Sequence, residues 1–372
     1  MGLVINNHMH MNNEVPGKKY FPWQQTWLVC MRWAYEETPT KGIPSPSGFE
    51  RDPHALYPRQ GLRFADPEGT HTIEAMDEGG IDMSVILPID YDFSWGSQSD
   101  ISIEEKHEHQ AQMVAKYPGR FISFGGPDPR RAGSKEIFKR AITEHGAKGL
   151  KIIPKNGYYP WQEECYELYD VCMEYGVPMS SCTEPNTGGY NRGRFADPLH
   201  LLDVVGDYPD MPLTLLHAGN PLYDYFEKSL FVASGNHNTS IELNYWLKPG
   251  AGVAEASTAP VFGMPMGKNV LNEETGVMML ARARDILGAH KISWGIDIHF
   301  GPKMKNSGWK LAEWLRGLEK TAAKYGQKFT QEEIDLILGE NVARTLGIKE
   351  YPEWDRPAKY GYTRRVPRPR YH

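Results

Sequence analysis

The sequence predicts an α/β protein, and within that class a (β/α)8 TIM-type barrel with a long insertion after strand 1 and a C-terminal arm. Three observations lead to this fold: the chain has 372 residues, it holds about eight short apolar runs separated by helical stretches, and many of these runs end in polar side chains. Apolar runs without alternation are typical of parallel strands that are buried on both faces. An open doubly wound sheet is the alternative, but no GxGxxG motif follows any run.

Composition excludes several classes of function. The formal net charge of −6 gives no reason to expect nucleic acid binding. No apolar run approaches the roughly 20 residues that cross a membrane, and the N-terminus lacks the basic and apolar segments of a secretory signal. The four cysteines form no CxxC pair, which fits a reducing compartment. We therefore expect a cytoplasmic protein that acts on a small molecule, without nucleic acid or membrane.

The first predicted strand carries half of a metal site. Residues 3–10 begin with three aliphatic side chains and end in His8 and His10. Residues i and i+2 of a strand point to the same face, so the two imidazoles lie side by side. Residues 12–70 follow as an insertion rich in aromatic residues and proline, with a helix predicted near 24–37. Because long segments of this kind usually carry function, we expect the insertion to cover the site.

The chain then alternates between strands and helices. The further strands are predicted at 83–87, 121–124, 149–153, 178–182, 212–216, 240–243 and 292–296. The helices are predicted at 104–117, 135–145, 161–175, 198–208, 222–233, 273–287, 310–325 and 331–346. The barrel domain is thus expected to span 1–349. Residues 350–372, with four prolines and four tyrosines, are expected to form an arm that packs on a neighbouring subunit, with a solvated tail as the alternative.

Polar residues at the strand ends are informative because catalytic groups of these barrels lie at the C-terminal ends of the strands. The candidates at these positions are His8, His10, Asp90, Lys151, Cys182, Glu184, His217, Glu242, Asn244, Asp297 and His299. The remaining histidines, His107 among them, are expected in loops or on helix surfaces and without a role.

His8, His10 and Asp297 form a set of two histidines and one carboxylate that joins the first and last strands, which are neighbours in a closed barrel. Such a set suits Zn, Mn or Fe and leaves coordination positions open for water, substrate or oxygen. Water bound there has a pKa near 7 and is a nucleophile, and Asp297 would accept its proton. The alternative for Asp297 is a helix N-cap.

Three further residues are candidates for catalysis or substrate binding. His217 ends an apolar strand before two small residues, and is expected as a further metal ligand or as a general acid/base. Lys151 lies between apolar residues, where it would bind a substrate carboxylate or, if carbamylated, bridge two metals. The alternative for Lys151 is a buried ion pair with Glu184 or Glu242. Glu184 itself is a candidate for substrate binding, and Asp90 is either a cap or a substrate contact.

Four motifs in this order resemble the amidohydrolase superfamily, in particular the branch that includes aminocarboxymuconate-semialdehyde decarboxylase and γ-resorcylate decarboxylase. They are HxH at 8–10, LLHAGNP at 215–221, WGID at 294–297 and ILGENVARTLG at 337–347. The resemblance implies a divalent metal held by the first-strand histidines, a fifth-strand histidine and the eighth-strand aspartate. Carried over, His8, His10 and Asp297 would be ligands, and His217 would be the acid/base.

Two positions depart from that branch. Cys182 stands where the fifth-strand histidine is expected, and Asn6 stands where an acidic residue usually precedes the first histidine by two. Cys182 or Glu184 would then supply the missing ligand, or the site has one ligand fewer.

The resemblance implies a metal-dependent hydrolase or non-oxidative decarboxylase that acts on a small carboxylated substrate, with zinc as the first expectation and iron or manganese as alternatives. A few proteins similar to this superfamily are iron- or manganese-dependent oxygenases, so a hydroxylase subunit is the second hypothesis. A non-catalytic partner subunit is the third. A homo-oligomer or a hetero-oligomer with a related chain is expected in each case.

Overall fold

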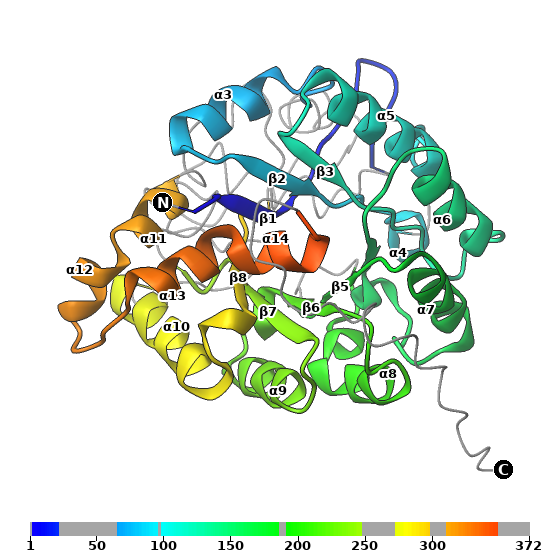
Figure 1. The fold of residues 1–372 in the computed structure, drawn as a ribbon. Helices are drawn as coiled ribbons and strands as arrows, with labels where there is room; N and C mark the ends of the chain where they lie inside the picture. The colour runs from blue at the N-terminus through cyan, green and yellow to red at the C-terminus, as the bar shows by residue number, and fades with distance from the viewer. Residues whose placement is uncertain are drawn as a thin grey trace, which may run out of the picture.

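The computed structural model describes residues 2–21, 65–95, 98–185, 191–247, 272–297 and 310–348, with the side chains of Trp95 and Lys310 left out. Within these residues, eight strands alternate with helices, and Figure 1 shows the strands at the centre of a ring of helices. The strands are β1 Ile5–Met9, β2 Met83–Ile86, β3 Phe121–Ser123, β4 Leu150–Ile152, β5 Met179–Cys182, β6 Leu213–Leu216, β7 Thr239–Leu243 and β8 Ile292–Trp294.

The strands pair in chain order and all pairs are parallel. One sheet has the order β1-β2-β3 and the other has the order β4-β5-β6-β7-β8. A parallel bridge between Gly125 and Leu150 joins β3 to β4. The last strand returns to the first, because the backbone N–H groups of Ile296 and Asp297 donate to the His8 carbonyl at 3.1 and 2.8 Å. The predicted barrel is thereby confirmed, with its first and last strands as neighbours.

Helices cover the outside of the strands, and most lie within two residues of the predicted ranges. The longer ones are α3 Thr70–Gly79, α5 Ile103–Lys116, α6 Ser134–Thr143, α7 Glu163–Tyr175, α9 Tyr223–Ser234 and α10 Glu273–Leu287. Local sequence sets their ends: Ser102 and Glu105 form a capping box at the start of α5, and Gly176 ends α7 in the left-handed conformation. No helix in the described part of the chain has the length and hydrophobicity of a membrane span.

Several elements differ from their predictions. Helix α3 was not expected, and a short helix, α4 Asp92–Trp95, follows β2. The predicted helix 198–208 begins as a 3-10 turn, Pro198–Leu201, before α8 Leu202–Asp207. The predicted helix 310–325 divides at Gly317 into α11 Lys310–Arg316 and α12 Leu318–Ala323. The helix expected at 24–37, the arm at 350–372, His299 and most of the insertion lie outside the described residues.

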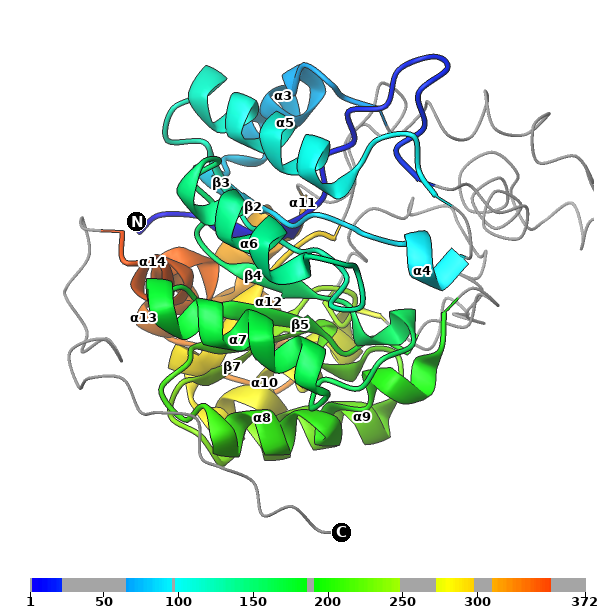
Figure 2. The ribbon, with the colours of Figure 1, turned by 90° about the vertical axis from the view of Figure 1, so that its right-hand side faces the viewer.

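The predicted helix 331–346 is also interrupted. It divides into α13 Gln331–Asp335, a π-helical turn Leu336–Glu340 and α14 Asn341–Leu346. The turn lies against β1, and a Cβ atom at Gly339 would lie 2.1 Å from the Leu3 carbonyl oxygen. Only glycine fits this close approach, which sequence periodicity does not reveal. Figure 2 shows α13 and α14 at one end of the barrel and α4 at the other.

Two histidines on α5, His107 and His109, are buried, although the sequence placed them in loops or on helix surfaces. His107 was expected in a loop or on a helix surface, but its side chain is buried against the barrel. Its Nε2 atom accepts a hydrogen bond from the Gly126 N–H at 3.2 Å, and burial lowers the pKa of His107 to about 3. His107 therefore holds the backbone after β3 as a neutral acceptor.

Candidate metal centre

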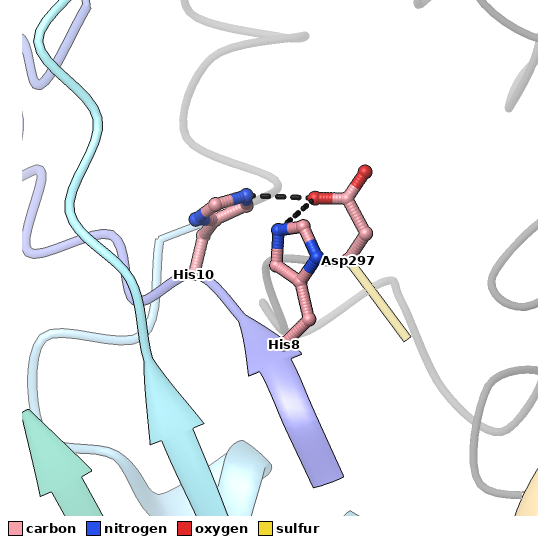
Figure 3. A group of neighbouring side chains, drawn as sticks. All are labelled: His8, His10 and Asp297. Atoms are coloured by element: carbon pink, nitrogen blue, oxygen red, sulfur yellow. Dashed lines mark hydrogen bonds and ion pairs between the residues drawn. The ribbon is translucent and has the colours of Figure 1, made fainter. Parts of the chain in front are cut away.

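Three donor atoms from the first and last strands converge at the C-terminal end of the barrel. The Nε2 atoms of His8 and His10 lie 2.9 and 2.8 Å from the same oxygen, Oδ1 of Asp297. Figure 3 shows the two rings turned toward that carboxylate, and both histidines are buried. The rings meet edge to face, with centroids 5.1 Å apart. The sequence prediction that these three residues come together is met by the geometry.

The spacing of these atoms suits a divalent ion. Metal bonds of 2.0–2.2 Å to nitrogen and oxygen place neighbouring donors of a tetrahedral site about 3.3–3.6 Å apart. The distances of 2.8–2.9 Å between Asp297 Oδ1 and the two Nε2 atoms are those of direct hydrogen bonds, so a small outward movement would admit an ion. Two imidazoles and a carboxylate are also the donor set that Zn, Fe and Mn accept.

The Nδ1 atoms of His8 and His10, which point away from Asp297, each face a hydrogen-bond acceptor. His10 Nδ1 lies 2.7 Å from the carbonyl oxygen of Leu87, just after β2. His8 Nδ1 lies 3.4 Å from Oε2 of Glu242, on β7. A carbonyl and a carboxylate only accept, so the Nδ1 atom of each ring is the donor to these groups. With an ion bound, the Nε2 atom of each ring would give its lone pair to the ion. This is the arrangement that orients metal-binding histidines.

Asp297 is held from its other side by Tyr245, which the sequence did not single out. The Tyr245 hydroxyl donates to Oδ2 of Asp297 at 2.8 Å, so that Oδ1 is the oxygen turned toward the histidines. Asp297 has a φ of +48°, in the left-handed region that non-glycine residues rarely adopt. Before it, Gly295 leaves no room for a side chain, because a Cβ atom there would lie 2.5 Å from the His8 Cβ. Such backbone strain clusters at functional sites.

His217 adjoins this group from the end of β6. Its ring centroid lies 5.0 Å from that of His8, and its backbone has a φ of +68°. The backbone N–H donates to Glu242 Oε2 at 2.9 Å, and the Nδ2 atom of Asn244 lies 2.9 Å from ring atom Nδ1. Ala218, with a φ of +42°, continues the sharp turn that the small residues after His217 predicted.

Neighbouring groups keep the Asp297 carboxylate charged. Burial opposes charge on Asp297, but the neighbouring His8 and His217 hold the pKa of Asp297 well below its usual value. Burial lowers the pKa of His10 to about 4 despite its bond to Asp297. For His8, burial is the largest single effect and lowers the pKa, but the negative charge of Asp297 and the hydrogen bonds to Asp297 and Glu242 together raise it. The centre is thus an anionic oxygen between two imidazoles.

Two buried lysines lie beside the histidines, and Lys155, which the sequence did not single out, forms the ion pair with Glu184. Lys155, in the 3-10 turn Pro154–Asn156 after β4, contacts Glu184 Oε2 at 2.5 Å. The alternative in which Lys151 pairs with Glu184 is therefore not supported, because Lys155 pairs with that carboxylate. Lys151 Nζ instead lies 3.5 Å from His8 Nε2, and burial lowers its pKa. Lys151 thus supplies an amine next to the site, as a substrate-binding role requires.

Two other clusters in the described residues have donor atoms close enough to share an ion. One contains His8, His217 and Glu242, and the other contains Cys182, Glu184 and His217. All five of these residues are buried. Cys182 stays a candidate ligand at the end of β5, where the resemblance led us to expect a histidine.

Asp90 belongs to a separate network after β2. Its carboxylate accepts two hydrogen bonds from Arg131, at 2.9 and 2.6 Å, and one from the Asp128 N–H at 2.9 Å. Burial opposes its charge, but the Arg131 guanidinium holds the pKa of Asp90 below its usual value. These contacts are those of a residue that holds the loops after β2 and β3 together, whereas a substrate contact of Asp90 stays a prediction.

Comparisons with known proteins agree with this architecture. The amidohydrolase family model matches residues 52–348, well over half of the chain, a match that includes His217 and Asp297 and begins after the first strand. No curated protein matches the chain by sequence.

Several solved structures share the fold at low sequence identity. 5-Carboxyvanillate decarboxylase from Sphingomonas paucimobilis is 13% identical, with a TM-score of 0.56, and the match covers 93% of this chain and 99% of that one. The same kind of enzyme from Novosphingobium aromaticivorans, with bound manganese, is 14% identical, with a TM-score of 0.57 and coverages of 93% and 97%. 2,6-Dihydroxybenzoate decarboxylase from Rhizobium is 12% identical, with a TM-score of 0.57 and coverages of 94% and 99%. The chain belongs to the amidohydrolase family.

Proposed function

We propose that this chain is a metal-dependent hydrolase or non-oxidative decarboxylase that acts on a small carboxylated substrate. The observation that carries the proposal is the convergence of His8, His10 and Asp297 next to a buried lysine, Lys151. Structures that share the fold act on 5-carboxyvanillate and 2,6-dihydroxybenzoate, which are small aromatic carboxylates, and this supports the substrate class.

His8, His10 and Asp297 would hold the ion, with zinc expected first and iron or manganese as alternatives. When bound, such an ion polarises a substrate oxygen or activates a water molecule. The neighbouring Lys151 would bind the substrate carboxylate, because an amine buried beside the centre favours an anion there. Glu184 would also contribute to substrate binding, from a carboxylate that is held by the neighbouring Lys155.

His217 would handle the proton that either reaction needs. In decarboxylation, the bond between the substrate carbon and its carboxylate breaks, the electron pair stays on the carbon, and CO2 leaves. A proton must then reach that carbon. His217 is buried and lies beside His8, so it is placed to donate this proton or, in hydrolysis, to protonate the leaving group. Asp297 would accept a proton from water in hydrolysis.

The first test is elemental analysis of the purified protein, as wild type and as His8→Ala and His237→Ala variants. His237 is exposed, so its replacement is a matched control for the loss of a histidine. We expect about one zinc per chain in the wild type and the control, and loss of zinc in His8→Ala. Equal metal content in all three proteins would overturn the proposed ligand set.

The second test measures the reaction. Wild type and His8→Ala are incubated without oxygen with a panel of small aromatic and aliphatic carboxylates, and CO2 release and loss of the carboxylate are followed. Turnover by wild type alone supports the proposal. Turnover that requires O2 and a reductant, with iron or manganese in the protein, would replace it with the oxygenase hypothesis.

A further inference from the structure

We propose that Asn244 fixes the ring of His217 with its proton on Nε2, so that His217 is a hydrogen donor to the site and not a metal ligand. The inference rests on the proposed function for its chemical meaning, but the proton position can be tested without it. Asn244 follows β7 and is fully buried, as is the ring that it contacts. It therefore acts as a positioning residue for His217.

The orientation of the Asn244 amide follows from its two contacts. Its Oδ1 atom accepts a hydrogen bond from the Tyr245 N–H at 2.6 Å, and its Nδ2 atom faces His217 Nδ1 at 2.9 Å. A flipped amide would turn its NH2 group toward the Tyr245 N–H, and two donors would face each other in a buried place. A buried donor without a partner costs about 1–3 kcal/mol, so the network assigns the NH2 group to His217.

This contact determines the state of the imidazole. Nδ1 accepts a hydrogen bond from the amide N–H, so it carries no proton of its own, and the single proton of the neutral ring lies on Nε2. The nearest carboxylate oxygen, Oδ2 of Asp297, lies 3.8 Å from Nδ1, which is too far for a competing hydrogen bond. His8 and His10 have the opposite arrangement, because their Nδ1 atoms face acceptors.

The two arrangements separate the histidines by role. With Nδ1 as their donor to Glu242 and Leu87, His8 and His10 can give Nε2 lone pairs to an ion that binds at Asp297 Oδ1, whereas His217 would keep an N–H on Nε2. A metal bond from His217 Nε2 would move its proton to Nδ1 and direct that proton against the Asn244 NH2 group. The two clusters that include His217 are therefore disfavoured as metal sites, and His8, His10 and Asp297 remain as the site of one ion per chain.

The test is nitrogen NMR of protein labelled with 15N-histidine, both free of metal and with one equivalent of Zn2+. The His217 signals are assigned with a His217→Gln variant. We expect the Nε2–H tautomer in both states of the wild type. Asn244→Asp replaces the donor by an acceptor, so its His217 should shift to the Nδ1–H tautomer. Asn236→Asp changes another buried asparagine, outside the site, and should leave the signals unchanged.

A proton on Nδ1 in the wild type, or a His217 Nε2 signal that moves to that of a bound ligand on adding Zn2+, would overturn the inference. An unchanged tautomer in a folded Asn244→Asp protein would also overturn it. Absence of zinc binding at His8 and His10 rejects the proposed ligands, but it leaves the tautomer in the metal-free protein measurable. The wild-type spectrum decides the matter even where a variant fails to fold.

Discussion

Replacing Glu242 by glutamine should weaken metal binding while leaving the barrel folded. Oε2 of Glu242 accepts the His217 N–H at 2.9 Å and faces His8 Nδ1 at 3.4 Å, and the side chain is fully buried. Oε1 has no hydrogen-bond partner among the described residues. Glutamine can place its carbonyl at Oε2 and its NH2 group at Oε1, so the two N–H donors keep an acceptor. What is lost is the negative charge that makes the His8 ring a stronger ligand.

The magnitude follows from these contacts. Removing an outer partner of a metal-binding histidine typically costs 10–100-fold in affinity, or about 1.4–2.7 kcal/mol. Glu242→Ala should do more, because it leaves two buried N–H groups without an acceptor, at about 1–3 kcal/mol of folding free energy each. A loss of affinity without a comparable loss of stability is thus expected for glutamine only.

The assay is a Zn2+ titration in competition with a chromophoric chelator, combined with urea unfolding of the metal-free protein. Glu227→Gln is the matched control, because Glu227 forms an exposed ion pair with Arg282, and such pairs contribute about 0–1 kcal/mol. Zinc affinity of Glu242→Gln within twofold of the wild type would refute the reasoning that Glu242 acts through His8.

Three further predictions concern stability and are checked by urea unfolding. Gly295→Ala should destabilise the protein by about 1–3 kcal/mol and weaken zinc binding, because its Cβ atom would meet the His8 Cβ at 2.5 Å; unchanged values would contradict the close packing. Lys155→Met should lower the free energy of unfolding by about 3–5 kcal/mol, because it leaves the buried Glu184 carboxylate without its cationic partner. Adding Glu184→Leu should recover most of this loss of stability. Burial lowers the pKa of His107 from its ordinary 6.5 to about 3, so between these values the unfolded chain binds a proton that the folded chain does not. The free energy of unfolding should therefore fall as pH falls from about 6.5 toward 3, by up to about 1.4 kcal/mol per pH unit. His107→Gln should remove this contribution to the pH dependence. Parallel pH profiles of the wild type and the variant would contradict the prediction.

Much of the barrel could be predicted because it follows from local patterns. Short apolar runs marked the strands, and the fixed side on which parallel strands end brought His8 and Asp297 together in the prediction, although 289 positions separate them. The predicted helix 273–287 matches α10 at both ends, because Asn272 caps its first turn and Gly288 follows its last residue. Local chemistry and barrel topology were sufficient in these places.

The parts that could not be predicted depend on tertiary contact. Lys155 reaches Glu184 through a 3-10 turn whose direction no periodicity gives. Tyr245 was missed because an aromatic residue after a strand reads as core, and its hydroxyl meets Asp297 only once β7 and β8 are paired. The π-helical turn before α14 lies where Gly339 approaches Leu3, a contact between residues that are far apart in the sequence.

The contact between the first strand, β1, and the last strand, β8, has a consequence for synthesis of the chain on the ribosome. His8 and His10 emerge first, but Asp297 and the backbone N–H groups that pair with the His8 carbonyl emerge after most of the chain has been made. A nascent chain therefore cannot assemble the proposed ligand set until the last strand docks beside the first. Metal captured there would favour the closed form over every earlier state, and so select chains that have completed the barrel.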